Sequence, residues 1–294
     1  MAIRNFMEML KARWAEGKFV CVGLDSEFGK IPESALRSGN ESCVSVANTI
    51  VAFNRVIVEA TKDTVCAYKP NIAFYEAHGD EGIVALHRTI VDIHAIAPDV
   101  PVILDAKRAD IGNTNNGYVK MAFEYFGADA ITVHPYLGAE ALKPFLQMPH
   151  KGIIVLCRTS NPGADEFQDL QVLVGEGIQT TSKPLYRVVA KNVAEHWNKN
   201  GNCAVVVGAT YPKELAEVRK IVGDMPILIP GIGAQGGDLE ESVNAGKDSK
   251  NQGMIINSSR GIIFASSGED FAEAARRETQ KLHDAIILYL RKEV

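Results

Sequence analysis

The stretch VPVILDAKRADIGNTNNGYVKMAFEYFGADAITVHP, residues 100–135, decides the fold. It opens with one apolar run, VPVILDAK (100–107), and closes with another, DAITVHP (129–135). Residues 117–126 lie between the runs and have a spacing of apolar positions that is typical of a helix. Each run is continuously apolar rather than alternating, which favours a strand buried on both faces, as in a parallel sheet.

The same strand–helix unit recurs along the whole chain. Further apolar runs are FVCVGLD (19–25), VCAYKPN (65–71), GIIVLCR (152–158), NCAVVVGA (202–209), MPILIPGI (225–232) and GMIINSS (253–259). Helical spacing is found at residues 43–62, 82–97, 138–147, 183–197, 212–222, 238–245 and 270–291. Eight strands alternating with helices predict a (β/α)8 TIM barrel, with residues 1–294 forming a single domain. An open, doubly wound parallel sheet is the alternative.

Composition excludes several classes of protein. The 294 residues include 31 basic and 36 acidic side chains, a net charge of −5, with 46% hydrophobic and 23% charged residues. These values exclude a disordered chain, a collagen-like repeat and a basic protein that binds nucleic acid through its overall field. No apolar run approaches the ~20 residues of a membrane span. We therefore expect neither nucleic acid nor a membrane as a partner.

The N-terminus and the cysteines indicate a cytoplasmic protein. Residues 1–19 are amphipathic, which predicts a helix packed on the domain, and they lack the apolar core of a signal peptide. The five cysteines are odd in number and lack the spacing of metal ligands. We expect them to be reduced, and buried where they fall within apolar runs. They are Cys21, Cys43, Cys66, Cys157 and Cys203.

Charged residues follow several of the predicted strands. Asp25 and Lys69 end the first two strands, and Asp105 and Lys107 end the third. The two-residue period of a strand puts Asp105 and Lys107 on one side, and Asp110 follows as the chain turns outward. A cluster of Lys69, Asp105, Lys107 and Asp110 is therefore expected at the mouth of the barrel. The alternative is a salt-bridge network that only caps the barrel.

Two segments near the C-terminus predict a phosphate site. PGIGAQGGD (230–238) follows the seventh strand and opens a helix, so its backbone N–H groups can approach an anion closely. SSRG (258–261) follows the eighth strand and supplies Arg260, a bidentate partner for phosphate. Barrel enzymes often bind phosphate after these two strands. Without Arg260, the glycine-rich segment could equally be a plain turn.

Two long polar stretches, residues 26–42 and 159–182, are predicted to be loops. Both follow a strand, so both are expected at the C-terminal mouth of the barrel, where active sites form. Long loops in compact domains often act as lids.

These segments resemble the orotidine 5′-phosphate decarboxylase family. LDAKRADIGNT (104–114) looks like its Asp-x-Lys-x-x-Asp motif, and the other matching segments occur in the family's order at the expected strand ends. They are AYKPN (67–71), SNPGA (160–164), PGIGAQGGD (230–238) and SRG (259–261). The resemblance runs from Leu24 to Gly261, and the long 159–182 region is similar to that of the larger bacterial-type members. It implies decarboxylation of orotidine 5′-phosphate to uridine 5′-phosphate, the last step of de novo pyrimidine nucleotide synthesis, without metal or cofactor.

The resemblance also implies catalytic roles. Lys107 would protonate the carbon from which CO2 departs, and Asp105 would lie against the substrate carboxylate. Lys69 would pair with Asp105 and contact the ribose. Asp110 would complete the charge network by reaching into the site of a second subunit, which implies a homodimer with shared active sites.

Eight substrate-binding residues follow from the same resemblance. Asp25 and Thr114 would contact the ribose, and Ser160 the edge of the pyrimidine. The 5′-phosphate would be held by the side chains of Gln235 and Arg260 and by the backbone around Gly233 and Gly261. Asn71 would also line the site.

The reaction explains why such residues are needed. Loss of CO2 from C6 of the pyrimidine leaves an sp2 carbanion that no adjacent carbonyl delocalises. The sequence shows no motif for an electron-sink cofactor or a metal cage, so a fixed ammonium near the developing charge is the remaining means of stabilisation. Asp105 and Asp110 favour the charged form of Lys107. Asp105 would repel the substrate carboxylate by about 4 kcal/mol at ~4 Å and an effective dielectric constant of ~20.

Three other functions remain open from the sequence. Sister barrels that act on sugar phosphates with Mg2+, such as keto-gulonate phosphate decarboxylase and hexulose phosphate synthase, would need a carboxylate where this chain has Lys69. A Schiff-base aldolase would need a strand-end lysine that loses its proton readily, against which the carboxylates around Lys107 argue. A barrel that only binds a phosphorylated metabolite is the non-enzymatic alternative. His134 is interpreted as a structural residue.

Overall fold

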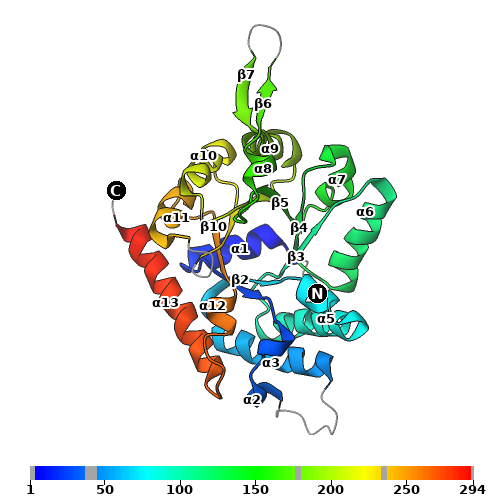
Figure 1. Cartoon of the computed structure of the whole chain (residues 1–294), viewed down its shortest axis with the longest axis vertical. Helices are drawn as coiled ribbons and strands as arrows, with labels where there is room; N and C mark the ends of the chain where they lie inside the picture. The colour runs from blue at the N-terminus through cyan, green and yellow to red at the C-terminus, as the bar shows by residue number, and fades with distance from the viewer. Residues whose placement is uncertain (1–3, 37–44, 176–179, 233–236, 293–294) are drawn as a thin grey trace.

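The strands form a closed parallel barrel. The computed structural model describes residues 4–36, 45–175, 180–232 and 237–292. The barrel strands are β1 (Val20–Leu24), β2 (Val65–Pro70), β3 (Ile103–Arg108), β4 (Ala130–Val133), β5 (Gly152–Arg158), β8 (Cys203–Val207), β9 (Ile227–Pro230) and β10 (Met254–Ser258). They pair in the order β2-β1-β10-β9-β8-β5-β4-β3, and parallel bridges Tyr68–Val102 and Asn71–Asp105 join the two ends of this series. The predicted barrel is confirmed, and the open-sheet alternative is wrong (Figure 1).

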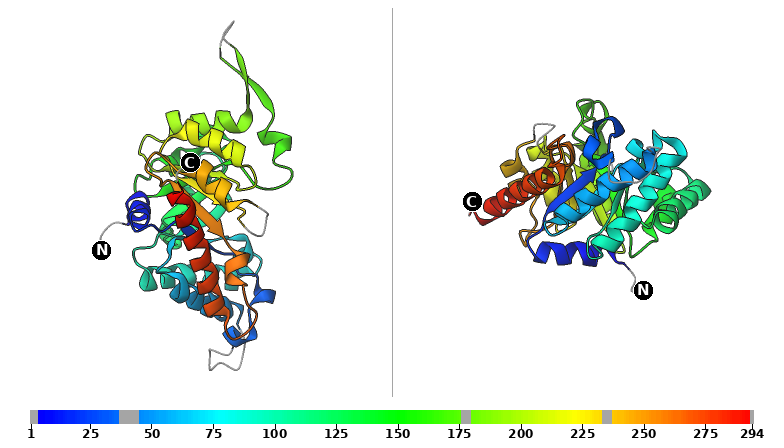
Figure 2. Two further views of the ribbon diagram at one scale, coloured as in Figure 1. Left: turned by 90° about the vertical axis from the view of Figure 1, so that its left-hand side faces the viewer. Right: turned by 90° about the horizontal axis from the view of Figure 1, so that it is seen from below.

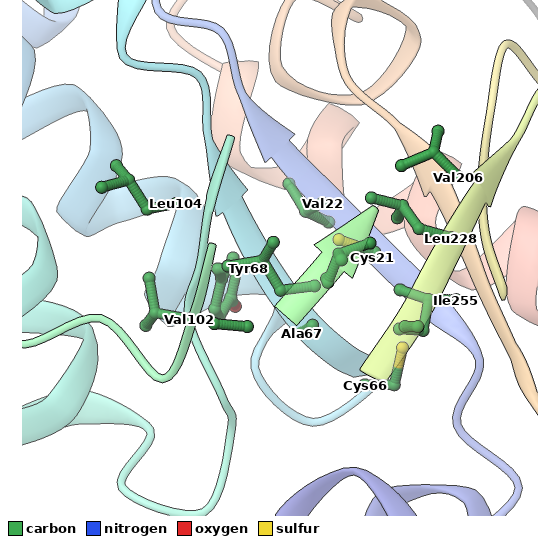
Figure 3. Close-up of a cluster of buried hydrophobic side chains, with 14 of the residues drawn as sticks. Cys21, Val22, Cys66, Ala67, Tyr68, Val102, Leu104, Val206, Leu228 and Ile255 are labelled. Atoms are coloured by element: carbon green, nitrogen blue, oxygen red, sulfur yellow. The ribbon is translucent and has the colours of Figure 1, made fainter. Parts of the chain in front are cut away.

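The barrel core explains the continuously apolar runs. Side chains from β1, β2, β9 and β10 gather with others in a buried cluster that includes Cys21, Cys66, Leu228 and Ile255 (Figure 3). All four described cysteines are free and buried, and burial raises the pKa of the Cys21 thiol to about 12. Cys43 lies outside the described residues.

Helices surround the barrel in the predicted places. They are α3 (Val46–Thr61), α5 (Gly79–Ile96), α6 (Gly112–Val119), α7 (Gly138–Leu146), α9 (Leu185–Asn192), α10 (Pro212–Val222), α11 (Leu239–Gly246) and α13 (Phe271–Arg291). π-Helical turns at Lys120–Tyr125 and Val193–Trp197 extend α6 and α9. Short helices lie in the connections: Phe28–Lys30 (3-10), α2 (Glu33–Leu36), α4 (Ala73–Glu76), α8 (Asp165–Gln168) and α12 (Arg260–Ile263). Within the described ranges, no helix is long and apolar enough to cross a bilayer.

Helix α1 (Phe6–Ala15) covers the N-terminal end of the barrel (Figure 2). Asn5 caps it by accepting a hydrogen bond from Met7 N at 3.1 Å. Arg13 Nε donates to Val65 O at 2.9 Å, and Trp14 Nε1 donates to Met254 O at 2.8 Å, so the helix is bonded to the starts of β2 and β10. The predicted N-terminal helix is confirmed, and the C-terminal end of the barrel is left for the site.

A hairpin stands where a continuous loop was expected. Strands β6 (Gln171–Val174) and β7 (Thr181–Pro184) pair in antiparallel register and project from the body of the molecule (Figures 1 and 2). The expectations of a loop through residue 182 and of a helix from residue 183 were wrong, since α9 begins at Leu185. Strands of four residues are too short to show a clear alternation, and TSKP in β7 contains no large apolar residue. We call β6 and β7 the hairpin arm.

Candidate active site

A cavity of about 420 Å³ lies at the C-terminal ends of the barrel strands. Six residues singled out from the sequence line it from the ends of four strands, β1, β2, β3 and β5, that are far apart along the chain. They are Asp25, Lys69, Asn71, Asp105, Lys107 and Ser160. Arg260, in the connection after β10, lines the same cavity. The barrel therefore gathers most of the predicted site into one place.

Two lysines and two carboxylates form a continuous chain of charge in this cavity. Lys107 Nζ donates to Asp105 Oδ1 at 2.7 Å, and Lys69 Nζ donates to Asp105 Oδ2 at 3.1 Å. Lys69 Nζ also lies 3.8 Å from Asp25 Oδ1. Asp105 thus lies between two ammonium groups, and we call Asp25, Lys69, Asp105 and Lys107 the charge array.

The two central members of the array are ionised because each stabilises the charge of the other. Burial alone would lower the pKa of Lys69, but the carboxylates of Asp105 and Asp25 outweigh it and raise that pKa. Burial alone would raise the pKa of Asp105, but the ammonium groups of Lys69 and Lys107 hold it well below its usual range. The side chain of Lys107 is 49% exposed, so its ammonium is accessible from the cavity.

The backbone at the end of β3 departs from a regular strand. Lys107 has φ 48°, in the left-handed region that non-glycine residues rarely adopt, and the register with β4 shifts between Leu104 and Arg108. Thr132 in β4 stabilises this bend, because its Oγ1 accepts from Ala106 N at 3.0 Å and from Lys107 N at 2.9 Å. A bulge at this point aims the Lys107 side chain toward Asp105.

Thr132 is also a site residue that the sequence reasoning missed. Its hydroxyl donates to Asp105 Oδ1 at 2.9 Å, and its side chain lines the cavity. The available signal was a lone hydroxyl in the buried run AITV of β4. The same signal marks Asn257 in MIINS of β10, which is 6% exposed and lines the cavity.

Asp110 and Thr114 do not line the cavity of their own chain. Asp110 N donates to Asn115 Oδ1 at 2.8 Å, and Asp110 Oδ1 accepts from Ile111 N at 2.6 Å. Thr114 is exposed and lines a separate hollow with Ile72 and Tyr118. Within one chain, three of the four residues of the expected cluster lie together, and Asp110 does not join them.

The predicted phosphate side is only partly described. Gly231 and Ile232 line the cavity beside Arg260, and Asp238 caps α11 by accepting from Glu241 N at 2.8 Å. Gly261 is exposed in α12 and is not part of the lining. Gly233 and Gln235 lie outside the described residues.

Close packing at the mouth requires a glycine in β1. A Cβ on Gly23 would lie 1.8 Å from Ser259 Oγ and 3.3 Å from Asn257 Oδ1, so only glycine admits these side chains.

Asn71 also lines the cavity, and its Oδ1 accepts from Ala73 N at 3.2 Å. His134 lies outside the cavity, where its Nδ1 accepts from Tyr136 N at 3.3 Å, in agreement with a structural role.

A closed barrel that gathers charged side chains at its C-terminal mouth defines the class of (β/α)8-barrel enzymes. Residues 19–277 match the model of the "Orotidine 5'-phosphate decarboxylase / HUMPS family", and the chain belongs to this family.

Similar proteins span nearly the whole chain. A protein of Cupriavidus metallidurans, named orotidine 5′-phosphate decarboxylase, is 49% identical over 286 residues, covering 97% of this chain and 98% of that protein. One of the same name from Cellvibrio japonicus is 45% identical over 291 residues, covering 99% and 98%. The solved structure of Leishmania donovani OMP decarboxylase superposes with a TM-score of 0.80 at 35% identity, covering 98% of this chain and 100% of that one.

Proposed function

We propose that this chain converts orotidine 5′-phosphate into uridine 5′-phosphate and CO2, the last step of de novo pyrimidine nucleotide synthesis, as a single catalytic domain. Besides family membership, one observation carries the proposal: Lys107 Nζ lies 2.7 Å from Asp105 Oδ1 in a cavity that Arg260 also lines. An ammonium, a carboxylate and an anion-binding guanidinium are the groups that this reaction requires.

Lys107 acts as electrostatic stabiliser and as proton donor. As the bond between C6 and the carboxylate carbon breaks, its electron pair remains on C6 and neutral CO2 leaves. The Lys107 ammonium stabilises this negative charge and then transfers a proton to C6, forming the new C–H bond. The neutral amine regains a proton from water, which returns the enzyme to its starting state.

Asp105 raises the free energy of the bound substrate by repelling its carboxylate, and it also holds Lys107 in place. Lys69 is only 4% exposed and keeps Asp105 ionised, so the substrate carboxylate meets a negative charge on binding. Their repulsion of about 4 kcal/mol at ~4 Å and a dielectric constant of ~20 vanishes when CO2 departs. We assign more of the catalysis to Lys107, because repulsion alone does not stabilise the carbanion.

The remaining residues bind the nucleotide. Arg260 forms a bidentate pair with the 5′-phosphate, together with Gln235 and the backbone around Gly233 and Gly261. Ser160 hydrogen-bonds the pyrimidine edge, Asp25 contacts the ribose, and Asn71 lines the site. Phosphate binding supplies the energy that offsets the juxtaposition of like charges at the other end of the substrate.

A homodimer would bring the missing carboxylate to the array. Asp110 and Thr114 follow β3 with Ile111, which is 65% exposed, and Tyr136, which follows the neighbouring strand β4, is 83% exposed. Large apolar side chains at the surface often mark a contact with another subunit. We propose that two copies pack there in the cytoplasm, so that Asp110 and Thr114 of one subunit complete the site of the other.

An absorbance assay with orotidine 5′-phosphate tests the function, with and without a chelator. We expect full conversion to uridine 5′-phosphate in both conditions. A chelator-sensitive reaction on a sugar phosphate would instead support the Mg2+-dependent sister enzymes. Trapping of substrate on Lys107 by borohydride would support an aldolase, and absence of CO2 release would leave only a nucleotide-binding role.

A further inference from the structure

A buried arginine at the end of β5 lies just outside the substrate cavity. Arg158 is 1% exposed and lines an outer hollow with Asp169 and Tyr211. Its Nη2 donates to Asp169 Oδ2 at 2.9 Å, and its Nε lies 2.8 Å from Asp169 Oδ1. Its guanidinium carbon lies 3.8 Å from the centre of the Tyr211 ring. Arg158 is thus a buried cation whose carboxylate partner, Asp169, reaches the surface with 37% of its side chain exposed.

The Arg158–Asp169 pair ties the end of β5 to the foot of the hairpin arm. Asp169 immediately follows α8 and stands two residues before β6. Leu185 N donates to Leu170 O at 2.9 Å, which closes the base of the arm. The connection from residue 159 to residue 168 is therefore held at both of its ends.

Gln168 clamps the inner side of the same connection. Its Oε1 accepts from Thr159 N at 2.8 Å, and its Nε2 donates to Thr159 Oγ1 at 2.8 Å. The Thr159 hydroxyl also donates to Asn161 Oδ1 at 2.6 Å. Thr159, Asn161 and Gln168 all line the cavity, so a displacement of Gln168 would change the cavity wall.

Ser160, between Thr159 and Asn161, lines the cavity on one side and packs closely against Gly208 on another. A Cβ on Gly208 would lie 2.6 Å from Ser160 Cβ and 2.8 Å from Ser160 N. Gly208 N donates to Arg158 O at 2.8 Å, and this hydrogen bond holds the two backbone segments at this separation. Ser160 therefore takes its position from the backbone of Arg158 on one side and from Gly208 on the other.

We propose that Arg158 is a positioning residue for recognition of the base. Through Asp169 and Gln168 it fixes residues 159–161 in the shape that presents Ser160 to the pyrimidine, although it does not line the cavity itself. The inference rests on the proposed function, because that function supplies the base to be recognised. If Arg158 has this role, Asp169 at the base of the hairpin arm contributes to the recognition of the base.

Two ligands separate positioning from general damage. We would measure by calorimetry the affinity for uridine 5′-phosphate and for ribose 5-phosphate, which lacks the base and keeps the phosphate for Arg260. In Arg158→Gln, affinity for uridine 5′-phosphate should fall by ~10-fold, the loss expected when the neutral hydrogen bond from Ser160 to the base is no longer formed. Affinity for ribose 5-phosphate should change by less than ~2-fold, because that ligand does not reach Ser160.

Further variants keep the proposal falsifiable if Arg158→Gln folds poorly. Gln168→Ala leaves the ion pair intact and removes the clamp on Thr159, and Asp169→Asn weakens the pair at a side chain that is already 37% exposed. Both should show the same selective loss. Arg187→Gln is the matched control, because Arg187 in α9 pairs with Glu217 in α10 at 3.7 Å and neither residue lines the cavity, so neither affinity should change.

Equal losses for both ligands, or unchanged affinity for uridine 5′-phosphate in these variants, would overturn the positioning role and leave the proposed function standing. If the parent protein itself fails to bind uridine 5′-phosphate, the proposed function falls, and this inference falls with it.

Discussion

At the scale of single residues, the position of Asp105 between two lysines dominates the site. Its oxygens accept from Lys107 at 2.7 Å and from Lys69 at 3.1 Å, and each lysine is thereby oriented as well as charged. A third donor, Thr132, removes the remaining freedom of the carboxylate. Such fixed dipoles and charges need no reorganisation during the reaction, which is the basis of electrostatic catalysis.

Replacing Lys107 should remove catalysis and leave binding. Lys107→Ala deletes both the stabilising ammonium and the proton donor, so kcat should fall by ~10⁴-fold or more. Affinity for uridine 5′-phosphate should persist, because Arg260 and Ser160 are untouched. The exposed Lys191 on α9, which pairs with Glu195 in the π-helical turn that follows, gives the control variant Lys191→Ala. Turnover by Lys107→Ala near the parent rate would contradict the proton-donor role.

Replacing Arg260 should weaken binding of phosphorylated ligands. Arg260→Ala removes a charge-assisted pair worth roughly 2–3 kcal/mol, so KM should rise by ~30- to 100-fold with a smaller change in kcat. Steady-state kinetics measure both constants. Arg276→Ala serves as the control, because Arg276 lies on α13, with Nη1 3.9 Å from Asp63 Oδ2. An unchanged KM in Arg260→Ala would argue against the phosphate assignment.

Sequence reasoning at this scale succeeded where strand geometry applies. The two-residue period placed Asp105 and Lys107 on one side, and the structure joins their side chains even though the backbone of Lys107 bends to φ 48°. Thr132 and Asn257 were missed because a polar residue in an apolar run shows its partners only after the strands are ordered around the barrel.

At the scale of elements, the N-terminal segment is fastened to the start of β4. Arg4 Nε donates to Asp129 Oδ1 at 2.9 Å, and Arg4 Nη2 donates to Asp129 Oδ2 at 2.8 Å. Burial alone would raise the pKa of Asp129, but its contacts with His94 and Arg4 lower that pKa from 3.8 to about 2. Asp129 also accepts from Val102 N at 2.9 Å, so one carboxylate joins three segments.

This carboxylate predicts a pH dependence of stability. Because the pKa of Asp129 is lower in the folded protein than in the unfolded chain, its charge stabilises the fold above about pH 4 by ~2 kcal/mol. That contribution should disappear as pH falls from about 4 towards 2. Urea unfolding should therefore show a difference between the parent and Asp129→Asn that is largest near pH 6 and shrinks in acid. A difference that is constant from pH 6 to pH 3 would contradict the assignment.

The regular elements were predictable and the hairpin arm was not. Strands and helices of the barrel follow from local periodicity, because each is buried against its neighbours. The pairing of β6 with β7 depends on two four-residue segments that contain no buried side chain, and Leu173 is 77% exposed. With so little burial, the pattern of apolar residues carries no signal for the pairing.

At the scale of the whole molecule, a single chain leaves Asp110 away from the charge array. Mixing two inactive variants tests whether a second subunit supplies it. Dimers formed from equal amounts of Lys107→Ala and Asp110→Ala would contain one unaltered site in each mixed dimer, so activity should return to about a quarter of the parent value. The measurement is turnover after subunit exchange, and size-exclusion chromatography checks that dimers form. No recovery after demonstrated exchange would exclude shared sites.

The spacing of residues alone could not predict where the side chain of Asp110 would lie. Asp-x-Lys-x-x-Asp places its last carboxylate after the end of β3, and the direction that Asp110 then takes depends on the turn into α6. The family resemblance supplied the idea of a second subunit, whereas composition and periodicity contain no information about it.

Helix α1, which is bonded to the starts of β2 and β10, also closes one end of the barrel to substrate and product. Because the helix covers one end and side chains fill the barrel interior, nucleotides enter and leave through the cavity mouth at the C-terminal ends of the strands. We therefore expect bound uridine 5′-phosphate to exclude the next substrate, so that turnover slows as product accumulates. CO2, being small and uncharged, can leave before the nucleotide does.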